Sequence, residues 1–197
     1  MGRVILDITV SLDGFVAGPN VCPEHPLGES GMRLLDWHFS DDSPANSIEE
    51  FIQLSASCRE ILEETAQTAG ARVTGRRTYD IAGGWIGEYL AYVPHFVLTH
   101  HVPARAAQET FVTDGIASAV NQARAAAGDK HVIITSPSVA QQCLQSGLLD
   151  EIQVHLVPVL LGDGVRLFDC IDYTELECTR VIAASDVTHL TYCVLKP

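Results

Sequence analysis

The sequence predicts a single α/β domain over residues 1–197 with three layers, a mostly parallel central sheet between helices that ends in an antiparallel hairpin. Short apolar strands alternate with helical segments along most of the chain, which is the pattern of parallel βαβ units. His131 to Thr135 is an apolar run, as expected for a central strand covered on both faces. Two strand-like segments at the C-terminus are separated only by a short turn at Ser185-Asp186, which indicates a hairpin.

The composition is that of one globular domain. Hydrophobic residues make up 47% of the chain, enough for one substantial core, and no repeat or interdomain linker is evident. The net charge of -13 argues against binding to nucleic acid or to an anionic membrane surface. No apolar run approaches the roughly 20 residues of a spanning helix, and the N-terminus is typical of a strand, not of a signal peptide. The six cysteines are scattered without a CxxC pair, so we expect reduced, mostly buried thiols in a cytoplasmic protein.

From alternation, helix caps and turn signals we predict, in chain order, a strand over 3–10, a loop over 21–44, a helix over 47–69, strands over 71–74, 95–100 and 110–113, a helix over 115–127, a strand over 131–135, a helix over 137–146, and strands over 151–157, 174–183 and 188–195. The first strand alternates and is rich in β-branched residues. The loop over 21–44 is long enough to be a functional loop or lid, in which Trp37 either lines a pocket or pins the loop to the core. The first helix begins in a capping box, Ser47 to Glu50, and Gly70 ends it.

The later elements have similar local signals. Asp114 is placed to cap the helix over 115–127, and Gly128 stops that helix. Ser136 has the N-cap position of the next helix, with Pro137 at its first position and Gly147 just past its end.

A glycine, two arginines and a hydroxyl follow the strand over 71–74, as Gly75, Arg76, Arg77 and Thr78. The glycine leaves room for a bulky anion to approach the backbone, and arginine offers a planar, permanently charged fork that suits phosphate. If a helix starts near Thr78, its free N–H groups add to an anion site. The alternative is an exposed turn with solvated arginines.

Two more strand ends carry groups that suit an anion. Thr99 and His100 follow one strand, and Thr135 and Ser136 lead from another into a helix. Because ligands of open α/β sheets lie outside the carboxyl ends of the strands, the three ends together favour an extended phosphorylated ligand such as a dinucleotide. The chain has no GxGxxG sequence, so this is not the Rossmann pattern.

Other chemistries have weaker support. His100 and His101 are adjacent on a strand and point to opposite faces, and no HExxH or ligand-spaced cluster exists, so we expect no metal site. The chain has no GxSxG nucleophile elbow. His155, inside a strand, is expected to be a packed or interface residue and not a base, and Asp163 a turn residue. Asp13 precedes a glycine, so a purely turn-forming role is an alternative to a role in the site.

Three stretches carry a family resemblance: VSLDGFVAGPN near the N-terminus, VTGRRTYDIAGGW in the middle and GLLDEIQVHLVPVLLGDGVRLF near the C-terminus. Together they resemble the dihydrofolate reductase-like superfamily. Within it they are most similar to the C-terminal reductase domain of the bifunctional riboflavin-biosynthesis deaminase–reductase, and to its stand-alone bacterial members. The resemblance spans nearly the whole chain and implies a dihydrofolate reductase-like fold. It also implies an NADPH-dependent reductase, often dimeric, that passes a hydride to a nitrogen heterocycle or a ribosylamino-pyrimidine.

The resemblance further implies roles for individual residues. Asp13 and Trp37 would lie near the substrate, and Asp13, Asp36 or an ordered water is the candidate proton donor. Cofactor contacts would come from the nicotinamide loop Val16, Ala17 and Gly18, the phosphate-binding Gly75, Arg76, Arg77 and Thr78, the ribose-flanking Thr99 and His100, and the helix start at Thr135, Ser136 and Ser138.

The chain departs from the family at that helix start, where the usual Gly-Gly is replaced by Thr135-Ser136-Pro137-Ser138. Two side chains take space that glycine leaves empty, and Pro137 removes one N–H that would donate to phosphate. The hydroxyl groups and the helix N-terminus compensate in part. The departure therefore keeps two alternatives open: a repurposed member that has lost NADPH and catalyses a non-redox step, and a non-enzymatic ligand-binding homodimer.

Overall fold

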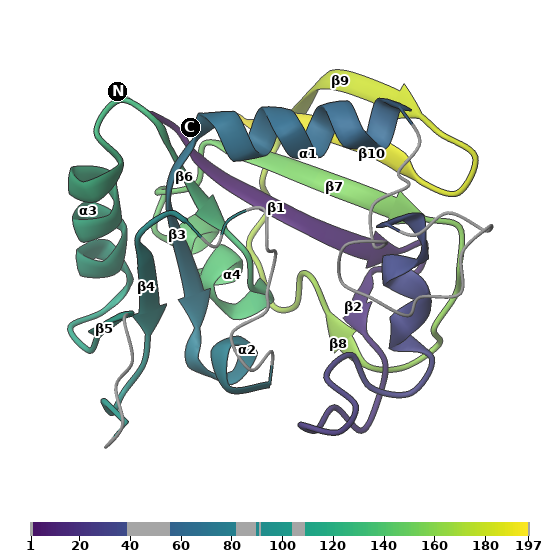
Figure 1. Cartoon of the computed structure of the whole chain (residues 1–197), viewed down its shortest axis with the longest axis horizontal. Helices are drawn as coiled ribbons and strands as arrows, with labels where there is room; N and C mark the ends of the chain where they lie inside the picture. Colours follow the sequence, from purple (N-terminus) through teal and green to yellow (C-terminus); the bar gives the residue numbers. More distant parts are fainter. Residues whose placement is uncertain (1, 39–55, 82–89, 91, 104–108, 197) are drawn as a thin grey trace.

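The computed structural model describes residues 2–38, 56–81, 90, 92–103 and 109–196. Its central sheet has eight strands in the order β5-β4-β3-β6-β1-β7-β10-β9 (Figure 1). Their bounds are β1 Val4–Ser11, β3 Ala69–Gly75, β4 His95–Leu98, β5 Thr110–Val112, β6 His131–Ile134, β7 Glu151–Val157, β9 Leu176–Ala183 and β10 Thr188–Val194. The strands from β5 to β7 run parallel, and β10 and β9 form the antiparallel edge. The predicted fold class is confirmed.

Helices lie on both faces of this sheet (Figure 1). On one face, α3 (Ile116–Ala127) and α4 (Pro137–Gln145) pack against the large core cluster. On the other, α1 (Ala56–Thr68) and the 3-10 helix η1 (Gly31–His38) contribute to smaller clusters. The short helix α2 (Arg76–Ile81) follows β3, and β2 (Phe15–Ala17) pairs with β8 (Val165–Arg166) in a separate two-stranded sheet.

The two faces of β1 are chemically different. Val4, Leu6 and Val10 enter the large cluster beneath α3 and α4. The alternate positions toward α1 begin with the apolar Ile5 but continue with polar residues, of which Asp7 is buried. A central strand therefore presents a polar row to the α1 side, and burial without a partner would be costly there.

The helix before β3 ends earlier than predicted. The structure ends α1 at Thr68 and places Gly70 inside β3, not after a helix end. A Cβ atom on Gly70 would lie 2.8 Å from both Cα and Cβ of Ala127, so the glycine serves the close approach of β3 to α3. The predicted capping box at Ser47 lies outside the described residues.

Several local predictions need correction. The loop over 21–44 contains the 3-10 helix η1, and its residues 39–44 lie outside the described part of the chain. Asp114 does not cap α3, because its carboxylate accepts a hydrogen bond from the hydroxyl of Ser118 (2.8 Å) and Gly115 has the N-cap position. Helix α2 starts at Arg76, two residues before Thr78. No helix among the described residues is both long and apolar enough to cross a membrane.

The six cysteines are all free, but only Cys58 and Cys143 are buried, so the expectation of mostly buried thiols was wrong. Burial raises the pKa of the Cys143 thiol to about 12, which leaves almost no thiolate at neutral pH.

We therefore expect a thiol reagent such as DTNB to label the exposed Cys170 and Cys178 first in the folded protein. Cys143 should become reactive only after unfolding in urea, because its thiol is both buried and protonated. Mass spectrometry of peptides from a time course measures the order. Labelling of Cys143 as fast as Cys170 would contradict the packing described above.

Candidate functional site

Three neighbouring parallel strands, β4, β3 and β6, end at the same edge of the sheet (Figure 1). The predicted strand ends are thereby brought together: Arg76 Nη1 donates to the carbonyl of His101 (2.9 Å) across β3 and β4, and Thr135 N donates to the carbonyl of Val73 (3.3 Å) across β6 and β3. We name the residues at this edge, Gly75, Arg76, Arg77, His100 and Ser138, the shelf.

Gly75 lets β3 approach the start of α4. Its N–H donates to Oγ of Ser136 (2.9 Å), and a Cβ atom on Gly75 would lie 2.9 Å from Oγ of Ser138. Ser136 is fully buried, and its hydroxyl is engaged by Gly75. Because a hydroxyl that accepts one hydrogen bond can still donate another, the expected contact of Ser136 with a phosphate stays a prediction. Ser138, in the first turn of α4, is exposed.

The two arginines differ in how much they are engaged. Nε of Arg76 donates to both carboxylate oxygens of Asp80 (2.8 Å each), and with its bond to the His101 carbonyl this anchors the guanidinium over the strand ends. Arg77 is exposed, and no ion pair joins it to any residue that the structure describes. Arg77 is thus the cation of the shelf with the most donors left for a ligand.

Thr99 and Thr78 are less exposed than Arg77 and His100. The hydroxyl of Thr99 is used within a turn, because it donates to the carbonyl of His101 (3.0 Å) and accepts from its N–H (3.2 Å). Thr78 is half-buried inside α2. His100 is exposed beside them. No group of three metal-binding side chains suited to hold an ion occurs among the residues that the structure describes.

The nicotinamide loop predicted at Val16, Ala17 and Gly18 is closely packed backbone. Ala17 pairs with Val165 of β8, and a Cβ atom on Gly164 would lie 2.1 Å from the carbonyl oxygen of Ala17. A Cβ atom on Gly18 would lie 1.9 Å from the carbonyl oxygen of Glu29. Only glycine fits at these two positions, so the loop has a fixed path.

Asp13 fastens this loop to the segment before β8. Its Oδ1 accepts from the hydroxyl of Ser11 (2.6 Å) and from N–H of Leu161 (3.2 Å), and its Oδ2 accepts from N–H of Gly162 (2.7 Å). The hydrogen bond from Ser11 and those from the two backbone groups lower the pKa of Asp13 to about 2. A carboxylate held in this way is a poor proton donor at neutral pH, and the geometry supports the turn-forming alternative.

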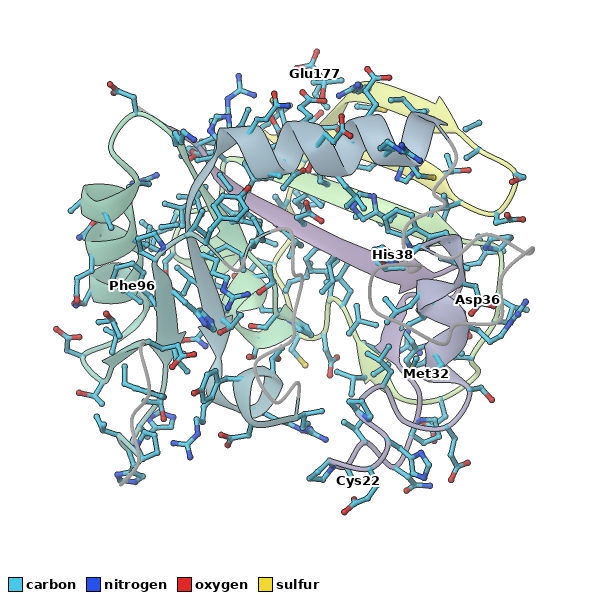
Figure 2. All side chains as sticks on the ribbon, in the orientation of Figure 1. Cys22, Met32, Asp36, His38, Phe96 and Glu177 are labelled. Carbon is cyan, nitrogen blue, oxygen red and sulfur yellow. The ribbon has the colours of Figure 1, made fainter. Side chains whose placement is uncertain are left out.

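Asp36 and Trp37 are neighbours on η1 with opposite surroundings. Asp36 forms an ion pair with Arg33, one helical turn away, at the surface. Trp37 is buried, and its Nε1–H donates to the hydroxyl of Thr9 on β1 (3.2 Å). Figure 2 labels Asp36 and His38 at the two sides of η1. Trp37 thus pins η1 to the sheet, whereas Asp36 pairs with Arg33 at the surface.

Beneath Trp37 lies a buried set of titratable side chains that was not predicted from the sequence. Asp7 Oδ1 lies 3.0 Å from Nε2 of His155, Nδ1 of His155 lies 2.8 Å from Nδ1 of His189, and Nε2 of His189 lies 3.4 Å from Sγ of Cys58. None of the four is more than 5% exposed. We name them the buried chain. Thr65 of α1 donates to the other oxygen of Asp7 (3.3 Å).

Aromatic packing seals the buried chain. The ring of Trp37 lies 4.9 Å from that of His155, 5.2 Å from that of His189 and 3.7 Å from that of His38, centroid to centroid. Burial, and then the neighbouring His155, lower the pKa of His189 to about 4 and that of His38 to about 4. His189 and His38 are therefore neutral at pH 7. His155 is a packed residue, as predicted.

One signal in the sequence was sufficient to find part of this set. Val4, Leu6, Ile8 and Val10 alternate as one face of β1, so Asp7, Thr9 and Ser11 must share the other. In a strand covered on both faces, such a polar row needs partners from other elements. The identity of those partners is a matter of tertiary structure.

Comparisons with known proteins agree with this architecture. Residues 3–190 match the model of the RibD C-terminal domain family. The uncharacterized protein YyaP of Bacillus subtilis is 25% identical over 178 residues, which are 84% of this chain and 80% of that protein.

Solved structures show the same fold. A putative riboflavin biosynthesis protein from Shewanella sp. PV-4 superposes with a TM-score of 0.68 at 22% identity over 100% of both chains. Dihydrofolate reductase from Enterococcus faecalis, complexed with NADP(H) and RAB-propyl, superposes with a TM-score of 0.61 at 12% identity over 99% of this chain and 98% of that one. A TM-score of 0.62, at 11% identity over 98% of this chain and 57% of the other, relates the chain to a protein from Thermotoga maritima. That protein is a diaminohydroxyphosphoribosylaminopyrimidine deaminase/5-amino-6-(5-phosphoribosylamino)uracil reductase. The chain therefore belongs to the RibD C-terminal domain family, a family of reductases with a dihydrofolate reductase-like fold.

Proposed function

We propose that the protein is an NADPH-dependent reductase of a ribosylamino-pyrimidine or a similar nitrogen heterocycle. The observation that carries the proposal is the shelf, where exposed Arg77 and anchored Arg76 lie at strand ends beside the start of α4, which Gly75 lets β3 approach closely. Cationic and hydroxyl donors at the carboxyl edge of a parallel sheet suit the phosphates of a dinucleotide.

The residues present fit such a cofactor. Gly75 lets β3 pack closely against the start of α4, where a Cβ atom would lie 2.9 Å from Oγ of Ser138, and Ser138 presents an exposed hydroxyl. In such a complex Arg77 and Arg76 would hold phosphate, Ser138 and the first turn of α4 would add donors, and the backbone of 16–18 would be available to the nicotinamide. NADPH supplies the hydride when bound, and the chain supplies binding and orientation.

The protein's own residues prepare the site in two ways. The bonds of Asp13 to Leu161 and Gly162 give the 16–18 loop one position, so little ordering entropy is lost when a ring binds against it. Trp37 and η1 close the α1 side of β1 and keep water out of the buried chain. A dry, ordered wall strengthens the electrostatic interactions of a bound heterocycle.

Titration of the protein with NADPH, followed by nicotinamide fluorescence, tests the proposal. We expect saturable binding, and we expect Arg77→Ala to raise the Kd about tenfold, because a charge-assisted bond to phosphate contributes roughly 1.5 kcal/mol. Arg59→Ala, which removes an exposed arginine from α1, is the matched control and should leave the Kd unchanged.

Activity is then measured as NADPH oxidation with 5-amino-6-(5-phosphoribosylamino)uracil, the compound that the Thermotoga maritima relative is named for. Failure of the folded protein to bind millimolar NADPH would refute the redox proposal. In that case, turnover of a heterocycle without cofactor would favour a repurposed enzyme. Binding of a heterocycle without its turnover would favour a ligand-binding protein.

We further propose that the protein acts as a homodimer in the cytoplasm. At the sheet edge, Leu176 and Val181 of β9 are 39% and 59% exposed, and they share a face with the half-buried Leu190 and Val194 of β10. An apolar sheet edge of this kind is a usual protein contact. Light scattering after size exclusion measures the oligomeric state.

A further inference from the structure

We propose that Asp80 is a positioning residue of the shelf, which holds the guanidinium of Arg76 in one orientation and leaves an edge of it free for a phosphate of the cofactor. The inference rests on the proposed reductase function. Asp80 lies in α2, which follows β3 (Figure 1), and its side chain is 50% exposed. A carboxylate repels phosphate, so an anion site does not need one beside its cations. The contacts of Asp80 therefore decide whether it helps or hinders binding.

Asp80 engages only one of the three nitrogens of the Arg76 guanidinium. Nε of Arg76 donates to Oδ1 and to Oδ2 of Asp80, each at 2.8 Å, so the two oxygens share a single hydrogen. Nη1 donates to the carbonyl of His101 (2.9 Å). Nη2 has no hydrogen-bond partner in the part of the chain that the structure describes. The planar group is thus held at two corners, and the third keeps two N–H donors.

The helix that carries Asp80 is fastened to the sheet, so the carboxylate has a fixed base. The hydroxyl of Tyr79 donates to Glu109 (3.2 Å), and the Tyr79 ring packs edge-on against that of Phe111 in β5, with centroids 5.4 Å apart. An (i, i+4) ion pair at the surface adds little stability by itself, because water screens both charges. The pair of Arg76 and Asp80 is therefore better explained by the side chain that it orders than by the free energy of unfolding that it adds.

The second corner of the guanidinium is held by a turn that has hydrogen bonds of its own. The carbonyl of His101 also accepts from the hydroxyl of Thr99 (3.0 Å), and that hydroxyl accepts from N–H of His101 (3.2 Å). Arg76 thereby joins α2 to the turn after β4, on which the exposed His100 lies. Because its orientation is already set, Arg76 loses little rotamer freedom when a phosphate binds.

Two effects of Asp80 on phosphate binding have opposite signs. Ordering a long, flexible side chain at the moment of binding weakens affinity by about two- to tenfold, and Asp80 avoids this loss. The negative charge of Asp80 also weakens the binding of an anion, but water screens this repulsion because Arg76 and Asp80 are 34% and 50% exposed. The ordering effect is the larger one, so Asp80 strengthens binding.

Asp80→Ala tests the proposal through the Kd of NADPH, measured by nicotinamide fluorescence. We expect the Kd to rise about three- to tenfold, because Arg76 is then ordered only when the cofactor binds. Asp80→Glu keeps a carboxylate on the same face of α2 and should restore a Kd within about twofold of the wild type. Glu64→Gln, which weakens the exposed pair of α1 with Arg180 of β9, is the matched control and should leave the Kd unchanged. The Tm should fall by less than about 4 °C in each variant, because the pairs are exposed.

The sign of the change in Kd is decisive. If Asp80 only repels the cofactor, Asp80→Ala lowers the Kd, and that result overturns the proposal. An unchanged Kd in Asp80→Ala, or a rise that Asp80→Glu does not reverse, overturns it as well. In an Arg76→Lys background, the change Asp80→Ala should have no further effect, because an ammonium group has no planar edge for the carboxylate to orient.

An NMR measurement on Arg76 needs no cofactor. In ¹H–¹⁵N spectra of the free protein near neutral pH, the Nε–H signal of Arg76 should be visible and slow to exchange, because the hydrogen is held by a carboxylate. The signal should disappear in Asp80→Ala and persist in Asp80→Glu. Equal exchange in the wild type and Asp80→Ala would show that Asp80 does not hold the arginine, and the inference alone would fail. If the signal behaves as expected but the wild-type protein binds no NADPH, the proposed function fails, and the role of Asp80 in binding falls with it.

Discussion

Lowering the pH from 7 to 5 is expected to destabilise the protein by several kcal/mol, through three histidines that resist protonation when folded. Burial and a nearby cation or histidine lower the pKa of His189 to about 4, that of His38 to about 4 and that of His95 to about 3. In the unfolded chain each has a pKa near 6.5, so between pH 6.5 and 4 the unfolded state binds protons that the folded state does not. The contribution of these histidines to the free energy of unfolding is therefore fully present above pH 6.5 and is lost as the pH falls toward 4.

The size of the effect follows from linkage. As the pH falls below 6.5, each histidine of this kind lowers the free energy of unfolding by up to about 1.4 kcal/mol per pH unit, which amounts to roughly 2 kcal/mol at pH 5. The half-exposed His38 and His95 contribute less, because solvent screens them. Asp13, whose pKa is lowered to about 2, adds to the acid sensitivity only below about pH 4. Between pH 6.5 and 4 the loss of stability therefore comes from the histidines.

Urea unfolding at pH values from 5 to 8 measures how the free energy of unfolding changes with pH. The titratable and charged groups around His189 are His155 of β7, Asp7 of β1, His38 of η1, Cys58 of α1 and Arg180 of β9. His189→Gln removes the titrating ring and should flatten the profile, whereas His100→Gln, at an exposed position, should leave it unchanged. A stability that is constant from pH 7 to 5 would show that the rings under Trp37 are accessible to protons when folded.

The sheet was predictable because its signals are local. Alternation, an apolar run at His131–Thr135 and a proline at the start of α4 are each read within one segment. Parallel strands then place their carboxyl ends at one edge, so the meeting of the arginine loop with Thr99 and Thr135 follows from the fold class alone. The family resemblance added the expected cofactor, which remains a proposal.

The buried chain was not predictable because its members are far apart in sequence. Asp7 and His155 are 148 positions apart, and Cys58 and His189 are 131 apart. Neither β2 nor β8 was predicted, since strands of 3 and 2 residues have no measurable period and their pairing depends on the distant Gly164. The inward turn of Ser136 depended on Gly75, which no pattern near Ser136 indicates.

Replacement of Trp37 by alanine is expected to lower the free energy of unfolding by about 3–5 kcal/mol, the usual cost of removing a buried aromatic side chain. The indole fills the space between η1 and the sheet, among Leu34, Cys58 and Val157, and no smaller side chain replaces these contacts. Trp37→Phe keeps most of the packing but loses the bond to Thr9 and part of the indole contacts, so it should cost about 1–2 kcal/mol, less than the alanine variant. Urea unfolding at pH 7 measures both variants.

The same alanine variant tests what holds the histidines neutral. If Trp37 keeps water from the buried chain, its loss should raise the pKa of His189 toward 6.5 and make the acid-induced loss of stability shallower in Trp37→Ala than in Trp37→Phe. A large loss of stability with an unchanged pH slope would mean that α1 and the sheet seal the rings without help from η1. Wild-type stability in Trp37→Ala would mean that η1 does not pack on β1 as described.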